Sequence, residues 1–291
     1  MTTALVLVVL AVVLAGPGPL WVARWDWLHQ VPRSAIVLWQ AGAVAALVAV
    51  IGAGVVLLHN LPEVAEPVRW IVTVALLLFI GHVVARLVWF GLKELRRSGL
   101  RRRTHRELVD LVASAETDPG RGHTHWVLAH DEPVAYCLPG LLKSRVVVSR
   151  GTVETLTADE FDAVLAHERA HLRARHDIVL DTFGALHRAF PVLIRSELPL
   201  TESRLLVEMM ADDHAIREVG RLPLARALTE LAGTRTPAAA LGAGPMVLER
   251  VSRLSRLHAH RPLLATLTCL LAAGLVALPA AILVAGHLLL G

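Results

Sequence analysis

The chain has 291 residues, 55% of them hydrophobic, and a formal net charge of +4 at pH 7. Its mean hydropathy of +0.56 exceeds that of ordinary soluble globular proteins. The composition therefore excludes this class of protein. The modest charge argues against a domain built to grip a polyanion, and two cysteines are too few for a disulfide framework.

Long apolar blocks lie towards both ends of the chain. Three contain no Asp, Glu, Lys or Arg: Ala4–Ala23, Ala35–Leu58 and Leu263–Leu290. The fourth, Val68–Leu92, contains only two charged residues, both arginines. Each is long enough to cross a hydrocarbon layer of about 30 Å. We therefore expect a mainly α membrane protein with four transmembrane helices, three within residues 1–92 and one within 263–291, and the lipid bilayer as a partner. A cleaved signal peptide is the alternative for the first block, although nothing basic precedes it.

Basic residues predict the orientation. They crowd the exit of the third expected span and precede the fourth: Lys93, Arg96, Arg97, Arg101, Arg102, Arg103 and Arg106, then Arg250, Arg253, Arg256 and Arg261. By the positive-inside rule both flanks face the cytoplasm. We therefore expect a multi-pass plasma-membrane protein with both termini outside and residues 93–262 in the cytoplasm. Arginines beside a span favour anionic lipid headgroups, so no direct nucleic-acid binding is expected.

Residues 93–262 read as one α+β domain. A helix is expected at Thr104–Ala115, followed by three short runs rich in β-formers: Trp126–Ala129, Val134–Leu138 and Arg145–Ser149. The second run is either an edge strand that a substrate peptide can join or an ordinary core strand. Further helices are expected at Ile178–Ile194 and from Thr201 to Gly220, whereas Gly233–Pro245 reads as a flexible connector.

The segment His167–His171, with the sequence HERAH, carries the chemistry. Positions four apart share one helix face, so the His167 and His171 rings can both reach one Zn²⁺ ion. A capping box formed by Thr157 and Glu160, and an apolar repeat after it, predict the helix that this geometry needs. The motif therefore predicts a site for one zinc ion with two histidine ligands.

A catalytic zinc ion takes three protein ligands and keeps one position open. Glu208 is the expected third ligand, and Asp212, four residues later on the same helix face, is expected to hold one of the ligating imidazoles by a hydrogen bond. The alternative for Glu208 is an exposed carboxylate paired with Arg204. Three other side chains are of types that zinc accepts: His176, Asp177 and His187.

Glu168 lies next to the first histidine of the motif and is the expected catalytic base. It would take a proton from the attacking water, whose pKa the metal lowers towards 7, and deliver it to the leaving amine. A non-enzymatic scaffold with structural zinc is a rival interpretation, but such a site has no use for a base. The sequence thus predicts a zinc metalloendopeptidase.

Three segments together resemble the BlaR/MecR-type membrane metallopeptidases: His167–Asp177, Arg145–Gly151 and Glu208–Asp213. The resemblance covers most of the chain and implies three N-terminal spans, a cytoplasmic α+β zincin-like metalloprotease domain of the gluzincin type, and a fourth span. It also implies an antirepressor in signal transduction, which cleaves a cytoplasmic winged-helix transcriptional repressor. Better-known members carry a penicillin-binding sensor after the fourth span. The sequence here ends at Gly291, so we expect no such sensor and do not carry over β-lactam sensing.

A quality-control protease resembling the HtpX type is the alternative function. It would also be a membrane gluzincin, but it would cleave many damaged membrane proteins instead of one partner. The sequence does not separate these two substrate classes.

Overall fold

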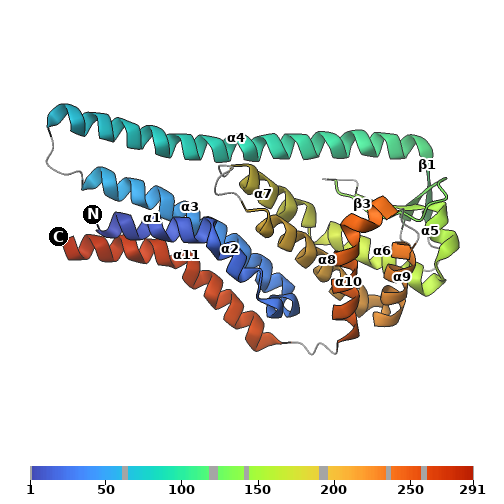
Figure 1. The fold of residues 1–291 in the computed structure, drawn as a ribbon. Coiled ribbons are helices and arrows are strands. Elements are labelled where there is room, and N and C mark those ends of the chain that lie inside the picture. The colour runs from blue at the N-terminus through green and yellow to red at the C-terminus, as the bar shows by residue number, and fades with distance from the viewer. Residues whose placement is uncertain are drawn as a thin grey trace. The chain divides into compact units, whose positions relative to one another are not determined.

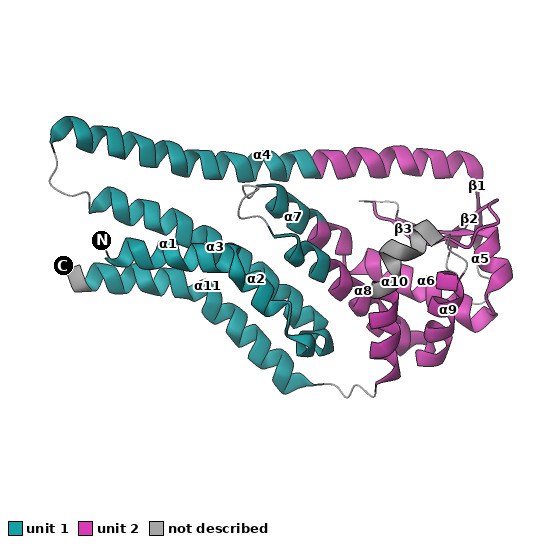
Figure 2. Ribbon diagram, in the orientation of Figure 1, with its two compact units in different colours: residues 1–94, 181–203, 260–291 teal, residues 95–180, 204–259 magenta. Residues whose placement is uncertain are grey.

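The computed structural model describes residues 2–60, 65–117, 124–140, 144–189, 196–233, 237–256 and 261–290. These residues are mostly helical, with one small sheet (Figure 1). They divide into two compact units, residues 1–94, 181–203 and 260–291 in the first and residues 95–180 and 204–259 in the second (Figure 2).

Long apolar helices make up the first unit: α1 (Thr2–Ala15), α2 (Pro17–Val22), α3 (Pro32–His59), the first part of α4 (Glu66–Val112) and α11 (Pro262–Leu290), with a short 3₁₀ helix at Asp26–Gln30. Helices α1 and α11 both pack along α3 (Figure 1). Small residues permit this close approach, since a Cβ atom on Gly52 of α3 would lie 3.1 Å from Leu283 of α11.

Among the described residues, three helices are long and apolar enough to cross a membrane: Pro32–His59, Glu66–Val112 and Pro262–Leu288. They are consistent with a membrane protein, whereas the number and direction of the spans stay predictions. The first expected span is not the single helix we predicted, because α1 ends at Ala15 and α2 begins at Pro17. Pro17 and Pro19 have no backbone N–H to continue the helical hydrogen bonds, and Gly16 leaves helical geometry at φ −101° and ψ −91°.

The second unit is built around a sheet, which has the strand order β1-β2-β4-β3 in the part of the chain that the structure describes: β1 (Ala113–Thr117), β2 (Thr124–Leu128), β3 (Ala135–Leu138) and β4 (Arg145–Ser149). Strands β2 and β4 are parallel and the outer pairs antiparallel, which puts β3 at one edge. Side chains alternate along β4: Val146 and Val148 pack against Leu165 of α6, and Val147 packs against Val109 of α4. Helices therefore cover both faces of the sheet.

The remaining helices follow in the order α5 (Arg150–Thr155), α6 (Ala158–Arg173), α7 (His176–Ala189), α8 (Leu198–Val219), α9 (Arg221–Gly233) and α10 (Pro237–Ser255). In the second unit, α6, α8, α9 and α10 share a core of small and aliphatic side chains: Ala163, Ala166, Ala215, Leu224 and Leu254. Because alanines dominate it, α6 and α8 can lie close together.

The expected elements differ from the observed ones mainly at their ends. The helix expected at Thr104–Ala115 is the end of the 47-residue α4, which stops at Val112. Helix α8 begins at Leu198, so Thr201 is not its cap, and the expected end of α7 at Ile194 lies outside the described residues. The connector expected at Gly233–Pro245 is wrong from residue 237 onwards, because α10 begins there; its alanines favour a helix, and proline is well suited to the first helical position.

Candidate metal centre

Helix α6 carries the HERAH motif. It begins with the expected capping box, in which the backbone N–H of Thr157 donates to Oε2 of Glu160 at 2.9 Å. His167 and His171 lie about one turn apart and therefore leave α6 on the same side. His167 is only 7% exposed, so its ring faces the protein interior.

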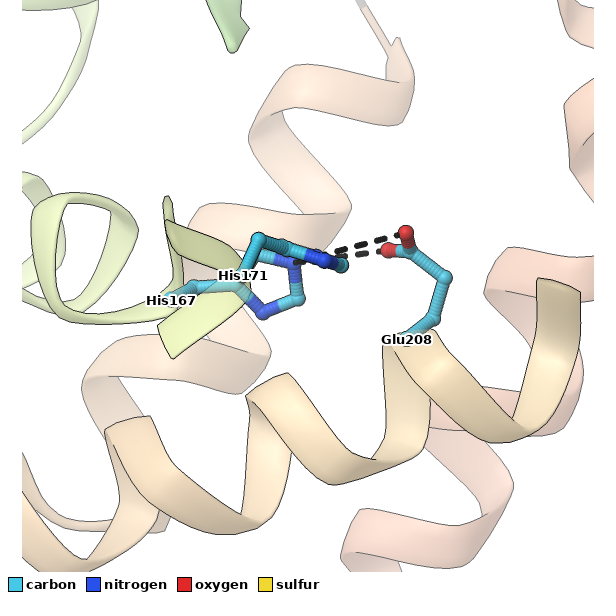
Figure 3. Close-up of side chains that lie close together, drawn as sticks. All are labelled: His167, His171 and Glu208. Carbon is cyan, nitrogen blue, oxygen red and sulfur yellow. Dashed lines mark hydrogen bonds and ion pairs between the residues drawn. The ribbon is translucent and has the colours of Figure 1, made fainter. Parts of the chain in front are cut away.

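The two rings converge on Glu208 of α8 (Figure 3). Nε2 of His167 lies 3.3 Å from Oε2 of Glu208, Nε2 of His171 lies 3.4 Å from Oε1, and the two Nε2 atoms are 3.0 Å apart. Ligand atoms bound tetrahedrally at about 2.0–2.1 Å to one zinc ion lie about 3.3 Å from each other. One ligand atom from each side chain lies within 4.8 Å of the others, so the three residues fit a single ion.

The outward nitrogen of each ring also has a partner. Nδ1 of His167 lies 2.9 Å from Oδ1 of Asp212, one turn beyond Glu208 on α8. Nδ1 of His171 lies 2.9 Å from Nδ1 of His176. Partners at this position fix the tautomer of a metal-binding imidazole and direct Nε2 towards the metal.

Burial and charge together set the protonation of these groups. Burial works to lower the pKa of His167, but contacts with Asp212 and Glu208 outweigh it and raise the pKa to about 9. Burial lowers the pKa of His171 to about 4, so this ring is neutral at pH 7. Burial opposes the ionisation of Glu208, yet His167 and Arg250 hold its pKa well below the usual range. A metal ion therefore finds an ionised carboxylate and one neutral imidazole, and displaces a proton from His167 when it binds.

The sequence around α6 matches a known peptidase family. Residues 99–204 match the family model Peptidase family M48. No curated protein and no solved structure matches the chain. Together with the His-His-Glu cluster, the M48 match supports a metal-dependent peptidase, which implies a protein substrate.

The M48 match ends at residue 204, and therefore includes the HERAH motif but not Glu208, Asp212 or Arg250. The structure brings all three residues to the motif, of which the sequence predicted Glu208 and Asp212 but not Arg250. The match does not distinguish the BlaR/MecR type from other membrane metallopeptidases, so that finer resemblance stays a prediction.

A cavity of about 630 Å³ lies beside the HERAH motif. Its walls include Glu168 of the motif, residues 132–135 leading into β3, and side chains of α9. The carboxyl group of Glu168 contacts Cys137 of β3, and burial raises the pKa of Glu168. A raised pKa suits a carboxyl group that takes and returns a proton near neutral pH.

The other candidate ligands have different roles. Asp177 receives a hydrogen bond from Arg102 at 2.9 Å and contacts Arg175. Nδ1 of His187 lies 3.1 Å from the carbonyl oxygen of Ser196. Nδ1 of His176 contacts Nδ1 of His171, so His176 helps to orient a candidate ligand.

Sequence reasoning missed Arg250, which it counted among the arginines flanking the last span. Arg250 is buried and lies within hydrogen-bond distance of both Glu208 and Asp212. A signal was present in the sequence: Arg250 falls between Val247 and Leu254 on one helical stripe, so it interrupts the apolar face of α10 and not its polar face.

Proposed function

We propose that the chain is a membrane-anchored, zinc-dependent endopeptidase. The observation that carries this proposal is the convergence of Nε2 of His167, Nε2 of His171 and a Glu208 carboxylate oxygen at spacings that one tetrahedral ion requires. When bound there, zinc would polarise the scissile carbonyl and lower the pKa of the attacking water.

The residues of the chain then have distinct tasks. Glu168 takes the proton from the attacking water and passes it to the amine that leaves. Asp212 and His176 hold the two imidazoles in the orientation that offers Nε2. Glu168 lines the cavity, as a base needs to, and this placement supports the enzyme over a scaffold with structural zinc.

Strand β3 supplies a surface on which an extended substrate can be held. The backbone N–H of Ser149 donates to the carbonyl of Val134 at 2.8 Å, so the Val134 backbone faces β4. Along an antiparallel pair the backbone groups alternate sides, so those of Ala135 and Cys137 face away from β4. A peptide added along this side would lie next to Glu168, which Cys137 contacts.

For the substrate, we propose a cytoplasmic transcriptional repressor with a winged-helix domain, as the resemblance to BlaR/MecR-type proteins implies. The peptidase unit would face the cytoplasm, and both termini would lie outside. The repressor would bind DNA, and we propose no direct binding of nucleic acid to this chain. The rival substrates are damaged membrane proteins, as for an HtpX-type protease.

One variant tests both levels of the proposal. Glu168→Gln should keep the full zinc content, because it leaves all three ligands, and should lose at least about 10²-fold in peptide hydrolysis. Normal turnover in this variant would refute the assignment. In cells, proteomics of Glu168→Gln against the unmodified chain should show one accumulating repressor; scattered membrane-protein fragments lost from the variant would favour quality control.

A further inference from the structure

Two arginine–aspartate pairs join α10 to α8 within the second unit. Arg250 donates from Nε and Nη2 to the two carboxylate oxygens of Asp212, at 2.8 and 2.6 Å. Arg253 donates from both Nη atoms to Asp213, at 2.7 and 3.0 Å. Both arginines are 8% exposed, so each pair is a two-point contact made by a buried arginine.

The pairs differ in their relation to the candidate metal centre. Nη1 of Arg250 lies 2.9 Å from Oε2 of Glu208, the same oxygen that lies 3.3 Å from Nε2 of His167. Through Asp212, Arg250 is also linked to the outward nitrogen of His167. Asp213 follows Asp212 by one residue, so it leaves α8 about 100° further round the helix.

From this arrangement, which rests on the proposed zinc site, we infer that Arg250 is a positioning residue of the metal centre. Its planar guanidinium holds the carboxylate of Glu208 and the Asp212–His167 pair at the same time. One side chain of α10 thereby positions candidate metal ligands on both α6 and α8. It also offsets the repulsion between the carboxylate of Glu208 and the buried carboxylate of Asp212. A lysine keeps the charge but lacks the rigid fork, so it cannot hold both carboxylates in one geometry.

The test compares Arg250→Lys with the matched control Arg253→Lys in the full chain in detergent. Zn²⁺ affinity is measured by competition with a chromophoric chelator, and the ligand geometry by the absorption spectrum of the Co²⁺-loaded protein. We expect Arg250→Lys to weaken Zn²⁺ binding about 10–100-fold, as for other outer-sphere partners of metal ligands, and to shift the Co²⁺ bands. Arg253→Lys should change the affinity less than about threefold and leave the spectrum unchanged.

Two results would overturn the inference. One is an unchanged Zn²⁺ affinity in Arg250→Lys; the other is an equal loss in Arg253→Lys, which would trace the effect to the docking of α10. Thermal unfolding of the metal-free chains verifies that both variants are folded. If Arg250→Lys is unfolded, Arg250→Gln replaces it. Arg250→Gln should weaken Zn²⁺ binding at least as strongly. Failure of the unmodified chain to bind Zn²⁺ would instead overturn the proposed function.

Discussion

Nδ1 of His167 and Oδ1 of Asp212 lie 2.9 Å apart, and both residues are buried. Once a metal ion has displaced the second ring proton of His167, the remaining proton lies on Nδ1, next to the carboxylate, and the lone pair lies on Nε2. Asp212 and Glu208 belong to the same helix, about one turn apart. Helix α8 therefore supplies both a candidate ligand and the group that orients a ligand of α6.

Asp212→Asn should weaken Zn²⁺ binding about 10–100-fold, because an amide holds the imidazole less firmly and no longer balances the charge of Arg250. The neighbouring Asp213→Asn removes the same charge from the partner of Arg253 and serves as the control. Competition with a chelator measures both affinities. Full affinity in Asp212→Asn would show that the contact with His167 does not support the metal site.

Part of the site could be predicted because its logic is local. The spacing of His167 and His171 fixes their common helix face, and the spacing of Glu208 and Asp212 does the same on α8. Arg250 could not be assigned in this way, since its partners lie on another helix and only the packing of α10 against α8 reveals them. The sequence places Arg250 on the apolar face of its helix, but it does not name the residues that Arg250 contacts.

The fold shows the same division between local and tertiary causes. The three expected strands were found near their expected places because their β-branched residues act locally. Strand β1 was missed, since Ala113–Thr117 has little β-propensity and its pairing with β2 decides its conformation. The break at Gly16 was readable from the adjacent prolines, whose effect outweighs the apolar character of the segment.

The edge strand offers a test of how the substrate is held. Ala135→Pro removes a backbone N–H that faces away from β4, and edge strands tolerate such a change. We expect about a fivefold to tenfold lower kcat/KM, the effect of one lost hydrogen bond of about 1 kcal/mol. Zinc content should stay the same. Ala135→Ser keeps the N–H and should behave as the unmodified chain does; equal losses in both variants would point to the side chain instead.

The capping box predicts a pH-dependent part of the stability. Hydrogen bonds from Thr157 hold the pKa of Glu160 below its ordinary value in the folded chain. A lowered pKa stabilises the fold above the unfolded pKa of about 4.3, and this contribution is lost as the pH falls through the folded pKa. Glu160→Gln should therefore reduce the free energy of unfolding by about 0.5–1 kcal/mol at neutral pH.

This difference between Glu160→Gln and the unmodified chain should shrink below about pH 4, where the carboxyl group is protonated in both states. Denaturant unfolding of both chains from neutral to acidic pH measures it, and acid effects on the zinc ligands cancel because both chains share them. Asp159→Asn removes a neighbouring carboxylate of the same helix turn and should cost less. A difference independent of pH would rule out ionised Glu160 as the source.

The turn after β4 holds the wall of the cavity in place. Oγ of Ser149 accepts a hydrogen bond from the N–H of Val134 at 2.9 Å and donates to the carbonyl of Glu132 at 2.8 Å. The N–H of Gly151 donates to the carbonyl of His130 at 3.0 Å. The segment that leads into β3 is thereby fixed against α5, and this close approach requires glycine: a Cβ on Gly151 would lie 1.8 Å from the carbonyl oxygen of Asp131.

Gly151→Ala should therefore force the segment at Asp131 to move, because a backbone oxygen cannot yield as a flexible side chain can. We expect a loss of about 1–3 kcal/mol in the free energy of unfolding and a higher KM, since residues 132–135 line the cavity. Gly99→Ala is the control, since the described structure leaves open space around that position of α4, and it should be neutral or stabilising by up to about 1 kcal/mol. If Gly151→Ala matched Gly99→Ala in both stability and KM, the turn after β4 would not be what positions this wall.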